Sequence, residues 1–330
     1  MSEPATELMN EFARMKMKDV IVTGGSGFIG RSLSVHLGRL VERGRKVIAL
    51  SSQDVDLANR EATFQWFERN QSAHEVSHIF HLAAVYKAGG WPATHPATQF
   101  HANMAINVNL LEAWKRFFPG ARLTNVVSYC MYPDHDRPHP ETELYGTEPE
   151  EYLFAYAFTK KALIIGQRAY CQEFGLSAVS LVLPTVYGPG DSFMEASHVM
   201  GALIGKFCRA AKESRESVEV WGDGNQEREF LFVEDAVDGI ITAATRATSP
   251  VLNLGTGRGV RVRDIAEIIR DEAKFSGATR YNTDRFVGAR RRVLCIDRIK
   301  QEIGWTAQTT LKEGIRRTIA FFRDSEPRKA

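Results

Sequence analysis

The sequence predicts an α/β protein: a doubly wound parallel sheet with helices on both faces, followed by a smaller, mixed α/β lobe near the C-terminus. Short β-branched runs alternate with segments of helical periodicity as far as residue 183, which is the pattern of successive βαβ units. The first of these runs leads directly into a glycine-rich loop and then a helix. Beyond residue 183 the alternation becomes irregular, so we expect the second lobe to begin there.

The chain length fits this division, because 330 residues are about twice a typical domain. We expect the middle of the chain to return to the first domain after a first excursion into the second lobe. The expected parts are a polar tail (1–18), a dinucleotide-binding domain (19–183, rejoined by 229–255), a substrate-binding lobe (184–228 and 256–323) and a final tail (324–330).

Charge and cysteine content exclude several functional classes. A formal net charge of +2 gives no sign of a nucleic-acid-binding surface. The four cysteines are widely scattered without metal-ligand spacing, so we expect reduced thiols and no metal site. No apolar run reaches the roughly 18 residues of a membrane span, and no apolar signal core opens the chain. These features predict a soluble, cytoplasmic protein that is not bound to membranes.

The glycine-rich loop is the first candidate site. The strand Asp19–Thr23 is followed by Gly24 to Gly30, and a helical pattern continues from Arg31. Glycines let the backbone approach a pyrophosphate, and the helix N-terminus offers N–H groups to it. The order strand, loop, helix favours a Rossmann-type dinucleotide site over a plain glycine turn. The residues expected to contact the cofactor here are Gly24, Ser26, Gly27, Phe28, Ile29 and Gly30.

The end of the second strand, at Leu50, bears on which dinucleotide binds. A carboxylate there would bind the ribose diol of NAD, but Ser51, Ser52 and Gln53 follow instead. Hydroxyls suit a 2′-phosphate better, with Arg31 as a possible counter-charge, so the sequence favours NADP(H) over NAD(H). Further cofactor contacts are expected at Ser51, at Asp56 and Leu57 near the adenine, and at Ala83 beside a buried strand; a helix N-cap explains Asp56 equally well.

Tyr156 and Lys160 are the candidate proton-transfer pair. Four residues apart on a predicted helix, they share one face. A phenol has a pKa of about 10, and a nearby cation favours the phenolate and lowers that pKa. The pair therefore suits the interconversion of a carbonyl and an alcohol, although an exposed pair with this spacing is common by chance.

Ser128 and Cys130 end the predicted strand that begins at Leu123, where open α/β sheets place their ligands. If the strand continues, alternate residues point the same way, so both side chains share a face. Ser128 would hydrogen-bond a substrate oxygen, and Cys130 would act as a base. The alternative for Cys130 is a small buried hydrophobic residue.

Several polar residues have two interpretations. His198 opens a predicted helix, where a cap or surface position is the common role. In the helix Asn103–Phe117, we expect Met104, Val108, Leu111 and Trp114 to form the buried stripe, with Asn103 and Asn107 as a cap and a surface residue. Arg290, Arg291 and Arg292 are expected to form a solvated surface patch.

Together these motifs resemble the extended short-chain dehydrogenase/reductase family that acts on nucleotide sugars. The resemblance is carried by Thr23 to Gly30, by Tyr156 with Lys160, and by Tyr187-Gly188-Pro189. Within that family it is similar to the GDP-L-fucose synthase group over residues 20–320. The specific segments are Lys87–Gly90, Ser128–Pro133, Glu148-Pro149, Ser197–Val199, Val220–Gly222, Arg228–Leu231 and Ile303–Trp305.

The resemblance implies 3,5-epimerisation and 4-keto reduction of a GDP-4-keto-6-deoxyhexose. Ser128 and Tyr156 would hold the ketone oxygen, Cys130 would be the base and His198 the acid, and Lys160 would bind the cofactor ribose. By position, Lys206 and Arg228 would bind the diphosphate with Trp221 nearby. Arg285-Phe286-Val287-Gly288 stands where the family has Lys-Pro-Asp-Gly near the nucleotide; arginine is not a simple substitute for lysine, and the aspartate on which the guanine assignment depends is missing. A homodimer through two long helices is typical of the family.

Three other functions stay open from the sequence. An NAD-dependent nucleotide-sugar 4-epimerase or a dehydratase is one, although such dehydratases carry an acidic pair where Tyr129 and Cys130 stand. A simple 4-ketoreductase acting on another nucleotide sugar would need neither Cys130 nor His198. A non-catalytic dinucleotide sensor is the third, and an intact Ser128, Tyr156 and Lys160 argue against it.

Overall fold

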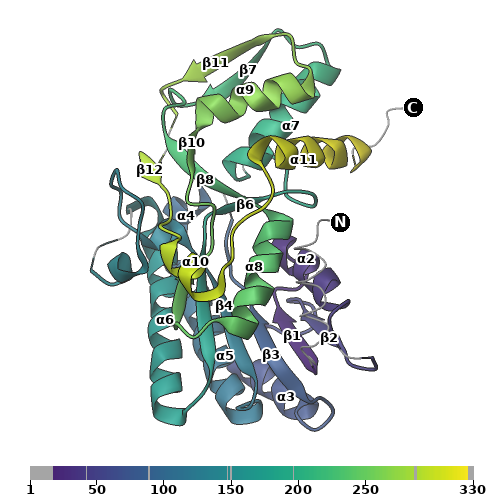
Figure 1. Cartoon of the computed structure of the whole chain (residues 1–330), viewed down its shortest axis with the longest axis vertical. Coiled ribbons are helices and arrows are strands. Elements are labelled where there is room, and N and C mark those ends of the chain that lie inside the picture. Colours follow the sequence, from purple (N-terminus) through teal and green to yellow (C-terminus); the bar gives the residue numbers. More distant parts are fainter. Residues whose placement is uncertain are drawn as a thin grey trace.

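A computed structural model describes residues 18–41, 43–87, 90–146, 148, 151–195, 197–285 and 288–325. The predicted tails up to residue 17 and from residue 326 lie outside this range, as do Ala88 and Gly89 of the glycine loop that starts at Lys87. The described residues pack around two hydrophobic cores, a larger and a smaller one. The elements of the smaller core lie above the main sheet in the view of Figure 1.

The larger core is built on a six-stranded sheet in the order β2-β1-β3-β4-β5-β9, with every neighbouring pair parallel. The strand order reverses between β1 and β3, and open α/β sheets bind ligands beyond the carboxyl ends of the strands at such a point. The strands are β1 (Asp19–Thr23), β2 (Val47–Leu50), β3 (Val76–His81), β4 (Arg122–Ser128), β5 (Ala178–Leu183) and β9 (Val251–Asn253).

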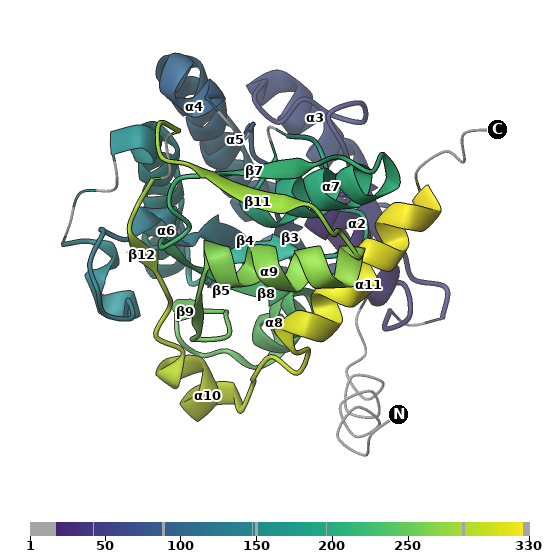
Figure 2. The same cartoon turned by 90° about the horizontal axis from the view of Figure 1, so that it is seen from above.

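Helices cover both faces of this sheet, which confirms the predicted fold class (Figure 2). One layer contains α2 (Phe28–Leu37), α8 (Val233–Arg246) and α10 (Asp297–Ile303); the other contains α3 (Arg60–Asn70), α5 (Pro96–Phe117) and α6 (Phe154–Phe174), with the short α4 (Trp91–Thr94) before α5. The link from β4 to α6 carries three short 3₁₀ turns, η1 (Tyr129–Met131), η2 (Glu141–Leu144) and η3 (Glu151–Leu153).

Helix α5 corrects the predicted buried stripe. Val108 is 53% exposed, whereas Asn103 and Asn107 are only 2% and 4% exposed. The amide of Asn103 bonds the backbone of Val85, and that of Asn107 bonds the carbonyl of Thr159. Their hydrogen bonds compensate for the burial of these polar groups, so neither is a cap or a surface residue.

The smaller core joins three helices and a two-stranded parallel sheet: α7 (Val199–Lys212), α9 (Val262–Ala273), α11 (Leu311–Ser325), β7 (Ser217–Trp221) and β11 (Ala278–Asn282). Between the two cores lies a third sheet in which β8 (Glu227–Phe232) pairs with β6 (Thr185–Tyr187), β10 (Gly259–Arg261) and β12 (Arg291–Arg292).

The C-terminal part of the chain contributes to both cores. Leu294, Ile299 and Trp305 pack in the larger core, whereas Ile315 and Phe322 pack in the smaller one. Residues 294–305 therefore lie with the first domain, although we expected them in the substrate lobe; the other domain boundaries stay a prediction. Among the helices described, none is both long and apolar enough to cross a membrane.

Candidate active site

The glycine loop after β1 is too tightly packed against backbone atoms to admit a side chain at Gly24 or Gly30. Gly24 has a φ of 71°, and a Cβ there would lie 2.8 Å from the backbone nitrogen of Ala83. A Cβ on Gly30 would lie 2.1 Å from the carbonyl oxygen of Gly24. Helix α2 begins at Phe28 after Gly27, with no side-chain cap on its first N–H groups. This uncapped N-terminus behind a tight backbone loop fits a dinucleotide diphosphate.

Strand β2 ends at Leu50 and is followed by Ser51, at the position where a carboxylate would bind the ribose of NAD. The N–H and hydroxyl of Ser51 both donate to Asp54, at 2.8 and 2.6 Å. Asp56 accepts from the N–H of Ala58 at 3.0 Å, as a capping residue does, and Leu57 is buried in the core. Arg31 donates to the carbonyl oxygens of Ser26 and Gly190 and so ties the glycine loop to the loop after β6.

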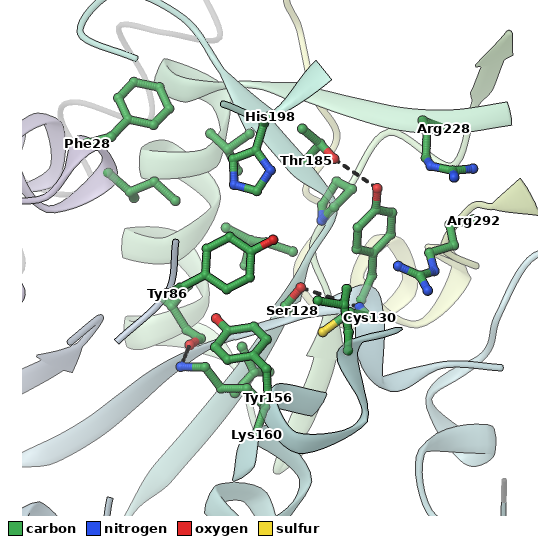
Figure 3. Close-up of a pocket in the computed structure, with 18 of the residues that line it drawn as sticks. Phe28, Tyr86, Ser128, Cys130, Tyr156, Lys160, Thr185, His198, Arg228 and Arg292 are labelled. Carbon is green, nitrogen blue, oxygen red and sulfur yellow. Dashed lines mark hydrogen bonds between the residues drawn. The ribbon is translucent and has the colours of Figure 1, made fainter. Parts of the chain in front are cut away.

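A cavity of about 610 Å³ lies between the two lobes at the carboxyl end of the main sheet. Of the expected cofactor residues, its wall contains Gly24, Gly27, Phe28, Ile29, Gly30 and Lys160. Ser26, Ser51, Asp56, Leu57 and Ala83 do not line it, and their cofactor contacts stay predictions. All five expected catalytic residues line this one cavity: Ser128, Cys130, Tyr156, Lys160 and His198 (Figure 3).

Ser128 and Cys130 reach the cavity for a different reason than expected. Strand β4 ends at Ser128, and Tyr129–Met131 form a 3₁₀ turn, so strand alternation does not align the two side chains. Instead the Ser128 hydroxyl caps the turn and accepts from the N–H of Cys130 at 3.3 Å. The turn brings the thiol and the hydroxyl to the same wall, where Cys130 is only 3% exposed.

Tyr156 and Lys160 share the cavity face of α6, with the Lys160 ammonium 5.7 Å from the Tyr156 ring centroid. The ammonium donates to the carbonyl oxygen of Val126 at 3.3 Å. Burial lowers the pKa of Lys160 to about 8. Burial, together with Cys130 and Tyr86, raises the pKa of Tyr156 well above its ordinary value. The expected lowering by Lys160 is therefore not found, and the phenol is protonated, as a proton donor must be.

His198 stands directly before α7, but its side chain does not cap that helix. The imidazole is exposed to the open cavity, and desolvation by the surrounding protein lowers its pKa. Tyr86, from the loop after β3, contacts it: the two rings are nearly parallel, with centroids 5.5 Å apart. Tyr86 was not singled out from the sequence, because an isolated tyrosine in a loop carries no local pattern.

Two arginines complete the wall on the far side of Cys130 (Figure 3). Arg228 was expected here, but Arg292 was assigned to a surface patch. Arg292 is only 6% exposed, and its guanidinium lies 5.7 Å from the ring centroid of Tyr129. The patch interpretation is wrong for this residue, because β12 pairs with β8 and turns Arg292 inward, whereas Arg290 stays largely exposed.

A second pocket of about 180 Å³ adjoins the first and shares Arg228 with it. Lys206 and Trp221 line it. The Lys206 ammonium and the Arg285 guanidinium each lie 5.3 Å from the Trp221 ring, so two cations flank one indole. The four residues expected to bind substrate therefore gather in one place, and an aromatic platform with adjacent cations suits a nucleotide.

His135, His139 and Glu143 form a cluster with metal-ligating residue types on the loop before η2 and in η2. The Glu143 carboxylate contacts both imidazoles, at 2.8 and 3.3 Å, and also pairs with Arg137. Two zinc ligands at bond lengths of about 2.1 Å in a tetrahedral site would be roughly 3.4 Å apart. The 2.8 Å contact and the guanidinium identify a hydrogen-bonded clasp of this loop.

Comparison with known proteins gives consistent results. The NAD dependent epimerase/dehydratase family matches residues 20–255. A putative GDP-L-fucose synthase 2 of Oryza sativa subsp. japonica is 32% identical over 312 residues, covering 93% of this chain and 87% of the relative. The GDP-L-fucose synthase of Escherichia coli (strain K12) is 28% identical, covering 95% and 99%. A solved GDP-L-fucose synthetase from Naegleria fowleri bound to NADP has a TM-score of 0.83 at 23% identity, covering 94% and 95%, which shows the shared fold.

Proposed function

Because the chain belongs to the NAD dependent epimerase/dehydratase family, we propose that it epimerises C3 and C5 of a GDP-4-keto-6-deoxyhexose and reduces C4 with NADP(H). The product is GDP-L-fucose or a related GDP-deoxysugar. The observation that carries the proposal is the convergence of Ser128, Cys130, Tyr156 and His198 on one cavity. A reductase alone needs the hydroxyl, the phenol and Lys160; the thiol and the imidazole are the groups that epimerisation adds.

The chemistry begins with the acidity of the C–H bonds beside the ketone, since the carbanion is delocalised onto oxygen as an enolate. Ser128 and Tyr156 hydrogen-bond that oxygen and stabilise its charge. Cys130 removes the proton, and His198 returns one to the opposite face of the sugar ring, which inverts the carbon. The proton abstracted and the proton returned balance, so the carbon skeleton keeps its oxidation state.

Reduction uses the same oxygen contacts. NADPH, held by the glycine loop and Lys160, would supply the hydride to C4, and Tyr156 would protonate the oxygen. The raised pKa of Tyr156 keeps this proton on the phenol until charge develops on the ketone. Lys160 holds the cofactor ribose. Arg228 and Arg292, which line the cavity, would hold the diphosphate. Lys206, expected at the diphosphate from the sequence, lies beside Trp221 with Arg285, so we assign these three residues to the nucleobase.

We also propose that the protein is a cytoplasmic homodimer in which the two copies pair through α5 and α6. These helices pack against each other and expose Phe100, Val108, Phe158 and Ile165, of which Phe100 and Phe158 lie with ring centroids 6.0 Å apart. Exposed apolar side chains gathered on adjacent helices favour association with a like surface. Sedimentation should give a dimer, and F158E should give a monomer; a wild-type monomer contradicts this assignment.

The test is incubation with GDP-4-keto-6-deoxymannose and NADPH in deuterated water. Cofactor oxidation with deuterium at C3 and C5 of the product is the expected result. C130S should lose most of the label while retaining cofactor binding, whereas C171S, on the partly buried part of α6, should match the wild type. Oxidation without label in the wild-type enzyme would identify a simple 4-ketoreductase, and no turnover would reject this substrate.

A further inference from the structure

Tyr86 enters the cavity from a backbone that is held in place. The residue before it, Val85, donates its N–H to the Asn103 side-chain oxygen at 2.9 Å and accepts from the same amide group at 2.9 Å. Gln99 adds a donor to the Val85 carbonyl at 3.4 Å. This two-way amide pairing anchors the loop after β3 to α5 one residue before Tyr86. The phenol ring therefore projects into the cavity from a fixed point (Figure 3).

The ring of Tyr86 stands between the two proton donors of the proposed reaction. Its plane is 6° from that of the His198 imidazole, with centroids 5.5 Å apart. On its other side it lies 4.9 Å from the Tyr156 ring, at an interplanar angle of 47°. Offset parallel stacking fixes the plane of a ring while leaving its edge accessible. The imidazole lines the cavity and stays exposed there, so its nitrogen atoms remain accessible to the sugar.

Within the part of the chain that the structure describes, no side-chain hydrogen bond orients His198, which does not cap α7. Among the described residues, His198 has its aromatic contact with Tyr86, and this nearly parallel packing favours the observed plane of the imidazole. Burial raises the pKa of Tyr86, so its phenol is uncharged and acts on His198 through ring packing. A leucine, which is smaller than tyrosine, would fill part of the space without offering a planar face.

We propose that Tyr86 is a positioning residue for the proton transfer at His198, and that the face of its ring carries this role. The inference rests on the proposed function, since it concerns the epimerase half of that reaction. Hydride transfer to C4 depends on Tyr156 and Lys160, which also contact each other and are held by α6, so loss of the Tyr86 ring should reduce it less than it reduces proton transfer at His198. Loss of the ring should therefore separate the two halves of the reaction.

The first test compares Y86L and Y86F with GDP-4-keto-6-deoxymannose and NADPH in deuterated water. Y86L should lower the ratio of deuterium incorporation to cofactor oxidation by about 10- to 100-fold, within the range that a positioned acid contributes. Y86F should keep the wild-type ratio, because it keeps the ring. An equal fall of both activities in Y86L, or no change in the ratio, overturns the proposal. A fall in Y86F as large as in Y86L also overturns it, since the hydroxyl would then be the active group.

The second test needs no substrate, so it separates a failure of this inference from a failure of the proposed function. Proton NMR of the free enzyme should show the imidazole C–H signal of His198, assigned by its absence in H198Q, displaced by the ring current of Tyr86. The displacement should persist in Y86F and vanish in Y86L. An undisplaced wild-type signal, or one unchanged in Y86L, shows that the rings are not stacked in solution.

Discussion

The two walls of the cavity are built in opposite ways. The wall that we propose binds the cofactor (the cofactor wall) consists of the glycine loop, the end of β4 and the first turns of α6, and each contributes a short, continuous run of residues. The wall that we propose binds the substrate (the substrate wall) is formed by three residues from separate segments: His198 precedes α7, Arg228 lies in β8 and Arg292 lies in β12. Motifs define the first wall, whereas long-range contacts assemble the second.

The contacts that assemble the second wall are few and specific. Glu229 accepts the N–H of Leu294 at 2.7 Å and that of Gly257 at 2.9 Å, which fixes the segment after β12 beside β8. Asp134 accepts from the backbone of Arg290 and Arg291, at 3.0 and 3.3 Å. Each of these carboxylates joins segments distant in sequence. The substrate wall should therefore be more sensitive than the cofactor wall to changes outside the cavity.

Of the predicted changes, loss of the Glu229 contacts should destabilise the substrate wall most. Glu229 is fully buried, and E229A leaves backbone donors of Thr256, Gly257 and Leu294 without their acceptor. Since each buried, unsatisfied donor costs about 1–3 kcal/mol, we expect a loss of roughly 3 kcal/mol or more in the free energy of unfolding. Urea unfolding measures this loss.

E229Q is the matched control for this prediction. Burial raises the pKa of Glu229 to about 7, and the amide preserves the shape and one acceptor oxygen. Because the two oxygens of Glu229 accept from different donors, the Gln NH2 faces the N–H of Leu294, and we expect E229Q to lose about 1–3 kcal/mol, the cost of that single unsatisfied donor. In E229Q the KM for the sugar nucleotide should rise while the Kd for NADPH stays constant. Equal weakening of both ligands would contradict the separation of the two walls.

The same division explains what the sequence could predict. Ser128, Cys130, Tyr156 and Lys160 lie in short motifs, so their convergence was predictable, although the 3₁₀ turn that aligns Ser128 with Cys130 was not. Asn103 and Asn107 carry a weak signal, because two amides one turn apart share one face of α5.

Arg292 and Tyr86 carry no such local signal. The burial of Arg292 follows from the pairing of β12 with β8. In that pairing Arg292 lies opposite Arg228, a residue far away in the sequence. The position of Tyr86 follows from the two hydrogen bonds between Val85 and the side chain of Asn103, which lies in α5. Neither pairing is encoded in the residues that immediately surround the side chain.

The arginine triplet 290–292 allows a sharper test, because replacing Arg292 and replacing Arg290 should have different effects on the KM for the sugar nucleotide. R292M removes a buried cation from the substrate wall and should raise the KM for the sugar nucleotide by about 10- to 100-fold, the value of a lost charge-assisted hydrogen bond. R290M removes a cation paired with Asp136, both largely exposed, and should leave KM unchanged. Steady-state kinetics with varied sugar nucleotide measures both. Equal KM values in R292M and R290M would place the substrate phosphates elsewhere.

The cofactor wall also contains one long-range chain of hydrogen bonds, centred on His81. This fully buried imidazole bonds the Thr23 hydroxyl at 2.8 Å through Nδ1 and the Asn107 oxygen at 3.3 Å through Nε2. Asn107 in turn donates to the carbonyl of Thr159, next to Lys160. The chain joins β1, β3, α5 and α6, so it ties the glycine loop to the helix that carries Tyr156.

Acid should weaken this chain, which gives the smallest of the expected effects. Burial, with the nearby charge of Lys160, lowers the pKa of His81 to about 3, whereas the unfolded chain has a histidine pKa of about 6.5. Below pH 6.5 the unfolded state binds a proton that the folded state does not, so stability falls as the pH falls from 6.5 towards 3. Between pH 7 and 5.5 His81 should account for a loss of about 1 kcal/mol. H81Q should be less stable than the wild type at pH 7, but its free energy of unfolding should fall less between pH 7 and 5.5, because glutamine does not titrate. Urea unfolding at both pH values measures the two falls. Equal falls in both proteins would mean that His81 is protonated in the fold and that its bond to Thr23 is formed differently.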